Sequence, residues 1–148
     1  MEQLYVSEFR LFFVMPFVEG GDLYSLFKVH RRFSEQLVKF YAAQITLALG
    51  YLHDKGIIHR DLKLENILVN KCGYLRIIDF GLSKYVDTPE SLSRTYCGTT
   101  EYLAPEMVQK TGHSFGVDWW ALGILIYEMV IGITPFFTKN KSTLFSRI

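Results

Sequence analysis

A short run near the middle of the chain carries side chains that suit the transfer of a phosphoryl group. The run HRDLKLEN occupies positions 59–66, and Asp79 opens the triplet DFG farther along. A carboxylate beside a hydroxyl accepts its proton, and Asp61 has the type and place for this role. Mg²⁺ prefers hard oxygen ligands, which Asn66 and Asp79 supply. Lys63 reaches the same side as Asp61 and can stabilise charge on the moving group.

Each of these residues alone has an ordinary structural interpretation. A lone aspartate in a loop is more often a turn residue or a helix cap than a base, and a lone DFG triplet is a weak signal. His59 is interpreted as a packed, structural histidine. The ordered combination of Asp61, Lys63, Asn66 and Asp79 is specific enough to outweigh these interpretations.

Composition excludes several classes of function. The net charge of +1 argues against a nucleic-acid groove or an anionic membrane surface as the main partner. Cys72 and Cys97 have no metal-like spacing and indicate free thiols in a reducing compartment, so we expect a cytoplasmic or nuclear protein. No signal peptide is evident at the N-terminus. The apolar run 119–133 is short for a membrane span and contains Glu128, so we expect a buried helix.

The first third of the chain predicts one strand and two helices. The segment Arg10–Met15 is rich in β-branched and aromatic residues and predicts a strand. Asp22 is expected to cap a short helix that runs to about Arg32. Ser34 is expected to cap a longer helix with an apolar stripe, which ends near Gly56.

The middle of the chain predicts a β-hairpin that holds the chemical residues at a defined separation. Two apolar runs, 67–69 and 74–78, flank a turn, with Asn66 just before the first and Asp79 just after the second. Asp118 is expected to cap a very apolar helix from Trp119 to Ile131. Two further segments are predicted, a mobile polar surface loop over 84–94 and an incomplete helix within 139–148.

The motifs together resemble the middle of a protein kinase domain. Beyond the run at 59–66 and the DFG triplet, the resemblance rests on FVM at 13–15, GGDL at 20–23, CGT at 97–99, EYLAPE at 101–106 and DWWALG at 118–123. The chain is most similar to the basophilic serine/threonine group that includes the cyclic-nucleotide-dependent kinases. Lys63 also favours serine/threonine over tyrosine kinases. The resemblance implies an α+β fold with a small-lobe strand remnant (1–15), a hinge (16–21) and an incomplete, mostly helical large lobe (22–148).

The resemblance implies ATP and Mg²⁺ as cofactors. Met15 would be the gatekeeper, and the backbones of Pro16 and Val18 would bond the adenine. The residues expected against the nucleotide are Met15, Pro16, Val18, Asp22, Glu65 and Leu68. For Met15 and Leu68, ordinary core packing is the alternative interpretation, and both can hold at once. Asn66 and Asp79 would hold the metal. Thr99 is expected to bridge toward Asp61 and Lys63.

The resemblance also implies protein substrates with basic motifs. Asp22, Glu65 and Glu128 match positions that hold arginines two and three residues before the target Ser/Thr, because carboxylates pair bidentately with guanidinium. Taken singly, Glu65 is more typical of a solvated surface charge. Tyr96 and Leu103 would line the pocket for the residue after the target.

The resemblance further implies that Arg60 and Thr95 are a regulatory pair. An upstream activating kinase would phosphorylate Thr95, and the phosphate would pair with Arg60 and order the surrounding loop. The alternative is that Thr95 is only a loop hydroxyl.

Two functions stay open at this point. The chain contains no Gly-rich loop and no V-A-I-K lysine, which grip the phosphates of ATP in the family. It is therefore either a segment of an active serine/threonine kinase or a truncated, inactive lobe that acts as a binding module.

Overall fold

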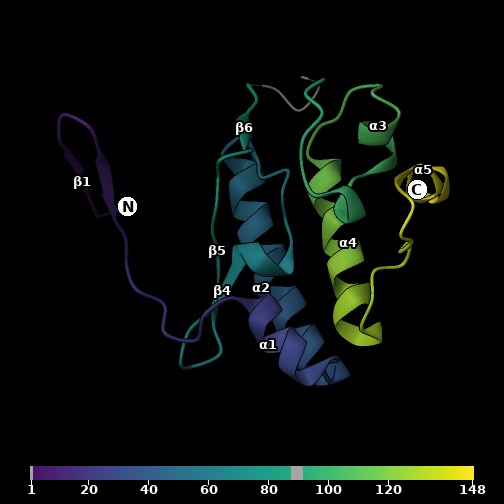
Figure 1. Ribbon diagram of the computed structural model, residues 1–148, viewed down its shortest axis with the longest axis horizontal. Helices are drawn as coiled ribbons and strands as arrows, with labels where there is room; N and C mark the ends of the chain where they lie inside the picture. Colours follow the sequence, from purple (N-terminus) through teal and green to yellow (C-terminus); the bar gives the residue numbers. More distant parts are fainter. Residues whose placement is uncertain (1, 88–91) are drawn as a thin grey trace.

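The body of the molecule is built by three helices and a small hairpin (Figure 1). The computed structural model describes residues 2–87 and 92–148. Helix α1 covers Leu23–His30, α2 covers Glu35–Asp54 and α4 covers Gly116–Ile131. Helix α2 packs against α4, and α1 contacts strand β4, Ile67–Val69. The observed α+β character agrees with the prediction.

The N-terminal segment forms a hairpin that lies apart from this body (Figure 1). Strands β1, Gln3–Val6, and β2, Leu11–Val14, pair antiparallel with Gln3 opposite Val14. Every residue of both strands is exposed. Strand β2 confirms the predicted strand, whereas β1 was not predicted because its four residues lack a marked alternation of apolar and polar side chains.

Helices α1 and α2 begin at the predicted caps. The Asp22 carboxylate accepts the backbone N–H of Ser25 at 2.7 Å, and the Ser34 hydroxyl accepts that of Leu37 at 3.3 Å. Each cap satisfies a donor that the first helical turn leaves free. Helix α1 ends slightly earlier than expected, because Arg31 turns to a left-handed backbone with φ of 65°.

The hairpin of β4 and β5, Leu75–Ile77, confirms the predicted pair of strands. Its register sets Ile67 opposite Ile77. The next rung extends this ladder, with the N–H of Ile78 donating to the carbonyl of Asn66 at 2.9 Å. Asn66 and Asp79 therefore lie at the same end of the hairpin.

The predicted start of helix α4 is wrong. The helix begins at Gly116, and Phe115 stands at its N-cap without a side-chain hydrogen bond. Asp118 lies inside the first turn, where its fully buried carboxylate faces another segment of the chain. A sequence pattern cannot separate an N-cap aspartate from one within the first turn, because the helix dipole favours both positions.

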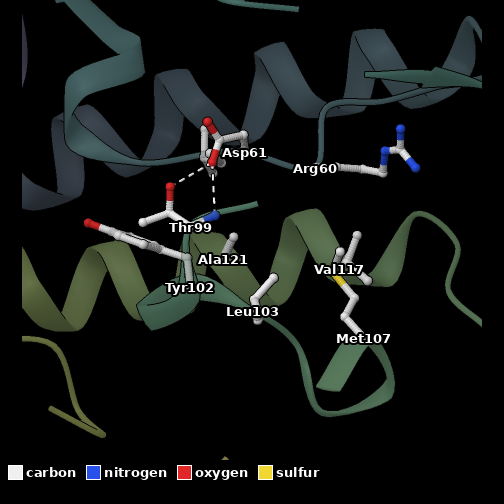
Figure 2. Close-up of a pocket in the computed structure, with 9 residues that line it drawn as sticks. Arg60, Asp61, Thr99, Tyr102, Leu103, Met107, Val117 and Ala121 are labelled. Atoms are coloured by element: carbon white, nitrogen blue, oxygen red, sulfur yellow. Dashed lines mark hydrogen bonds between the residues drawn. The ribbon is translucent and has the colours of Figure 1, made fainter. Parts of the chain in front are cut away.

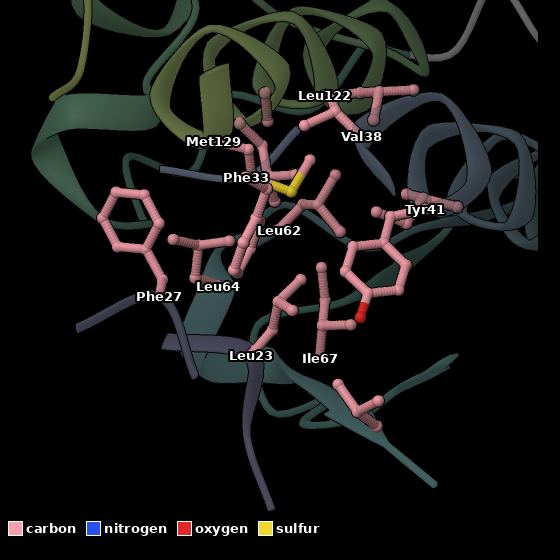
Figure 3. Packing of buried hydrophobic residues seen from close by; sticks show 14 of the residues in the cluster. Leu23, Phe27, Phe33, Val38, Tyr41, Leu62, Leu64, Ile67, Leu122 and Met129 are labelled. Carbon is pink, nitrogen blue, oxygen red and sulfur yellow. The ribbon is translucent and has the colours of Figure 1, made fainter. Parts of the chain in front are cut away.

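The main apolar core lies between α1, α2, α4 and the β4–β5 hairpin (Figure 3). Leu23, Ile45, Leu49 and Leu125 are completely excluded from solvent, as is Ile67 from the hairpin. Burying each such side chain contributes roughly 1.5–3 kcal/mol. Because Ile67 directly follows Asn66, the burial of Ile67 in the core also fixes the position of Asn66.

A second, smaller core lies under the C-terminal half of the chain and contains Ile58, Leu103, Met107 and Val117. The elements around it are β3 (Ile57–Ile58), β6 (Lys84–Tyr85), the 3₁₀ turn η2 (Thr100–Tyr102) and α3 (Pro105–Val108). Two more elements complete the described chain, the 3₁₀ turn η1 (Leu64–Asn66) and α5 (Lys141–Arg147).

Two predictions of the sequence concern other parts of the chain. The expected polar loop over 84–94 begins with β6, and its positions 88–91 lie outside the described residues. Helix α5 confirms the helix expected near the C-terminus. None of the helices in the described ranges has the length and apolar character that a bilayer crossing needs.

Candidate active site

The Asp61 carboxylate is the centre of a hydrogen-bond network (Figure 2). Its Oδ1 accepts the backbone N–H of Thr99 at 3.1 Å and the Thr99 hydroxyl at 2.8 Å. Its Oδ2 lies 2.8 Å from Lys63 Nζ and accepts Asn66 Nδ2 at 2.9 Å. Burial alone raises the pKa of Asp61, but the Lys63 and Thr99 contacts outweigh it, so the pKa lies below its usual value. The group is therefore an oriented, ionised carboxylate.

The contacts predicted for Thr99 are confirmed. Lys63 Nζ donates to Thr99 Oγ1 at 2.8 Å, while the same hydroxyl donates to Asp61. The Lys63 side chain is only 21% exposed, so its charge is directed to this centre and not to bulk solvent. A cation, a hydroxyl and a carboxylate from two distant segments thus meet at one point.

Asn66 and Asp79 have donors that fit a magnesium ion. Asn66 Nδ2 donates to the carbonyl and the carboxylate of Asp61, which turns the amide oxygen away from that network. Asp79 is held at φ of 60°, and its Oδ1 accepts the N–H of Gly81 at 3.1 Å. Hard oxygens of this kind suit Mg²⁺, which keeps several waters and phosphate oxygens as its other ligands. Among the described residues, no group of three or more His, Cys, Asp or Glu could hold a metal by itself.

Asp118 anchors the loop that carries Asp61 through hydrogen bonds, a role that the sequence did not indicate. Its carboxylate accepts the backbone N–H groups of His59 and Arg60, both at 2.9 Å. It also lies 2.8 Å from His53 Nε2, on helix α2. Three donors from two segments thus converge on one buried charge from α4. Because Arg60 takes a left-handed φ of 66°, this anchoring keeps a strained backbone in place.

Among the described residues, Arg60 forms its hydrogen bonds with partners other than Thr95. Its guanidinium donates to the carbonyl of Leu82 at 2.7 Å and to the Ser93 hydroxyl at 3.0 Å. Lys84 Nζ reaches the same buried hydroxyl at 3.4 Å. Thr95 is exposed, so its hydroxyl is open to solvent. The regulatory role of Arg60 and Thr95 stays a prediction, and Ser93 is an additional partner that the sequence did not indicate.

An apolar pocket of about 520 Å³ lies beside the predicted hinge. Met15, Pro16 and Val18 line this pocket together with Leu68 and Asp79. The backbone of Asp22 forms a bridge with Leu68, but its carboxylate caps α1 through Ser25. The four predicted adenine contacts therefore share one pocket, whereas Glu65 lines a different one.

That second pocket, called here the acidic pocket, has a volume of about 370 Å³. Glu65, Glu101 and Glu128 line it together with Thr99 and Tyr102. The Tyr102 hydroxyl donates to Glu128. Burial raises the pKa of Glu128, although the Tyr102 hydrogen bond opposes this. Two of the three predicted arginine-binding carboxylates thus meet in one pocket, and Glu101 joins them without having been predicted.

The two residues expected to receive the amino acid after the target, Tyr96 and Leu103, have different surroundings. Leu103 is 2% exposed and packs into the smaller core with Met107 and Val117 (Figure 2). The cavity it lines has a volume of only about 10 Å³. The ring of Tyr96 lies instead under Lys110 Nζ, 5.9 Å from it. The Leu103 side chain therefore belongs to the smaller core, and the cavity that it lines is too small for a substrate side chain.

Comparisons with known proteins agree on one family. A family profile described as "Protein kinase domain" matches residues 1–148. The chain is 48% identical over 139 residues to "cAMP-dependent protein kinase type 3" of Saccharomyces cerevisiae, which is 94% of this chain and 34% of that protein.

Two further relatives show the same extent of similarity. Identity is 49% over 139 residues both to the "cAMP-dependent protein kinase catalytic subunit" of Schizosaccharomyces pombe and to "Protein kinase C eta type" of Homo sapiens. These alignments cover 94% of this chain, but 27% and 20% of the two relatives. The chain thus spans about a third or less of the length of these three curated relatives.

Proposed function

Because this chain belongs to the protein kinase family, and within it to the serine/threonine kinases, we propose that it transfers a phosphoryl group from ATP to serine or threonine side chains of proteins. The observation that carries this proposal is the network around Asp61. Its carboxylate is ionised, only 7% exposed and oriented by three side chains and one backbone N–H. A base in phosphoryl transfer needs this kind of fixed position beside the acceptor hydroxyl.

Each residue of the network has a distinct part in the proposed reaction. Asp61 accepts the hydrogen bond of the acceptor hydroxyl and takes its proton as the new bond forms. Lys63 Nζ, already 2.8 Å from Asp61, can donate to the oxygens of the transferred group and stabilise their charge. Thr99 keeps both side chains aligned by donating to one and accepting from the other.

The family generally uses ATP and Mg²⁺, and the residues present here fit both. Asn66 and Asp79 would hold the metal ion through one amide oxygen and one carboxylate. The apolar pocket at Met15, Val18 and Leu68 would take the adenine. When bound, magnesium neutralises phosphate charge and aligns the phosphoryl group with the acceptor.

The proposed substrates carry arginine on the N-terminal side of the target residue. The acidic pocket supports this proposal, because Glu65 and Glu128 line it together and also border Thr99, which contacts Asp61. Guanidinium pairs well with carboxylates that are partly shielded from water. We also propose that an activating kinase phosphorylates the exposed Thr95 in a cytoplasmic or nuclear setting.

The test is direct phosphotransfer from labelled ATP to an arginine-containing serine peptide. The chain is compared with its Asp61→Asn variant, which preserves size and most hydrogen bonds. An Asp87→Asn variant, changed at an exposed position, serves as the matched control. We expect activity in the chain and in the control, and a loss of at least about a hundredfold in Asp61→Asn. Equal activity in all three proteins would refute the role of Asp61.

The same assay, together with a measurement of peptide binding, distinguishes the kinase from the inactive binding module. A chain that binds arginine peptides but transfers no phosphate, with or without Asp61, is a binding module. The absence of a Gly-rich loop from these 148 residues is the observation that favours it.

A further inference from the structure

A further pocket, lined by two positively charged side chains, adjoins the acidic pocket. It has a volume of about 410 Å³ and is lined by Tyr24, Phe27, Lys28, Arg31 and Gly132. Three of these residues, Tyr24, Phe27 and Gly132, also line the acidic pocket. The two pockets are therefore neighbouring parts of one groove. We call the pocket that contains Lys28 and Arg31 the basic pocket.

The basic pocket lies at the end of the groove away from the reacting centre. Thr99, which contacts Asp61, lines the acidic pocket but not the basic one. The basic pocket instead extends toward Arg31, just past the end of helix α1. A peptide that lies in the groove would thus meet Asp61 first, then the three glutamates, and finally the cations.

Neither of the two cations, Lys28 and Arg31, takes part in an ion pair among the described residues. The charge of Lys28 does act on the Asp22 carboxylate, whose pKa it helps to lower. Lys28 Nζ lies over the ring of Tyr24 at 4.8 Å, an arrangement that leaves its N–H donors available. The C-terminal end of a helix favours cations in general, which explains their position on α1 but assigns them no ligand.

The segment after helix α1, which carries Arg31, packs tightly against the C-terminal end of helix α4. Gly132 caps α4 with φ of 97°, and a Cβ at this position would lie 2.9 Å from the carbonyl oxygen of Arg31. The N–H of Phe33 donates to the carbonyl of Met129 at 2.9 Å. The ends of α1 and α4 are therefore held together, and Arg31 has a defined place beside the groove.

We propose that the basic pocket binds a carboxylate of the substrate, on an Asp or Glu that lies farther from the target residue than the arginines. This inference rests on the proposed function, because the arginines in the acidic pocket set the direction of the peptide. Charge complementarity carries it, since a peptide with arginine alone matches only half of the groove. The preferred substrate class is therefore a peptide whose acidic residue precedes its arginines, and a lysine or arginine at that upstream position is disfavoured.

The experiment measures binding, so it does not depend on catalysis. Fluorescent peptides with arginines two and three residues before a serine carry Glu, Ala or Lys at each upstream position in turn. Dissociation constants for the full chain are measured by anisotropy at low and high salt. At one upstream position we expect Glu to bind about three- to tenfold more tightly than Lys, because partly exposed ion pairs have modest energies. High salt should reduce this preference.

Charge-reversal variants test whether the basic pocket causes the preference. The double change Lys28→Glu and Arg31→Glu should reverse it, so that the Lys peptide binds more tightly. The milder pair Lys28→Met and Arg31→Met should remove the preference without reversing it, and serves if the first variant folds poorly. The control, Lys39→Glu with Lys71→Glu, changes net charge equally at exposed positions outside both pockets and should keep the preference.

The outcomes separate this inference from the proposed function. Tight binding of arginine peptides with equal affinity for Glu, Ala and Lys at every upstream position would overturn the basic pocket and leave the acidic pocket intact. A preference that survives charge reversal at Lys28 and Arg31 would also overturn it. If no arginine peptide binds at all, the substrate class proposed for the acidic pocket fails, and this inference fails with it.

Discussion

The exchange Asp118→Asn should release the loop that carries Asp61, and its cost in stability follows from the contacts of Asp118. The carboxylate accepts the backbone N–H groups of His59 and Arg60 and lies 2.8 Å from His53 Nε2. An asparagine has one acceptor oxygen, which can serve the two donors on one side. Its NH₂ group then points at the third donor, which is left without an acceptor inside the protein.

The magnitude is large because the site is dry. Asp118 is completely buried, and breaking a buried charged network costs about 3–5 kcal/mol. For a domain of about 150 residues, each kcal/mol shifts the melting temperature by roughly 2–4 °C. We therefore expect the midpoint of thermal unfolding, followed by circular dichroism, to fall by about 6–20 °C.

The matched control is Asp54→Asn, the same change at the exposed last residue of helix α2. A surface exchange of this kind should alter the free energy of unfolding by no more than about 0.5 kcal/mol. Amide hydrogen exchange gives a second measurement, since the N–H groups of His59 and Arg60 should lose protection only in Asp118→Asn. Equal melting temperatures for the two variants, with both amides still protected, would refute the anchoring role.

Three further predictions concern ionisation and hydrogen bonding. Burial first, and the charge of Arg60 second, hold the pKa of His113 below its ordinary value of 6.5. In this pH range the unfolded chain therefore binds more protons than the folded chain, so the free energy of unfolding should fall as the pH drops below about 6.5. Urea titrations should show a smaller fall in the His113→Leu variant than in the unchanged protein. Burial raises the pKa of Glu128. On acidification, affinity for arginine peptides should therefore begin to weaken at a higher pH than it would if Glu128 had the ordinary pKa of a glutamate. The variant Glu128→Gln should bind these peptides weakly at every pH. Thr99→Val removes one hydrogen bond to the ionised Asp61 and should lower kcat for phosphotransfer by roughly ten- to a hundredfold with little change in KM; an unchanged kcat would contradict the alignment role.

Local signals in the sequence predicted several elements in which a residue acts on its immediate neighbours. Asp22 and Ser34 were predicted as helix caps, because a cap needs only the N–H groups two or three residues later. The β4–β5 hairpin was predicted from two apolar runs around a short turn, where the Asn70 side chain accepts the N–H groups of Cys72 and Tyr74. In these cases the hydrogen-bond partners lie within a few positions along the chain.

Contacts between distant segments were predicted only where a family resemblance supplied them. The bridge from Thr99 to Asp61 and Lys63 was expected on that basis and is present. Asp118 was expected to cap a helix, but it binds backbone groups nearly sixty positions earlier, at His59 and Arg60. No periodicity of the sequence reports such a contact, because it depends on how α4 packs against α2.

The sequence by itself determined the family of this protein, because the order of Asp61, Lys63, Asn66 and Asp79 is the one that protein kinase domains carry. Only the tertiary structure decided which charges share a site. It set Glu101 beside Glu65 and Glu128, and it set Lys28 and Arg31 in the adjoining pocket. The physical reason is that electrostatic interaction depends on distance and on shielding from water, and both are set by the packing of α1 and α4 and not by spacing along the chain.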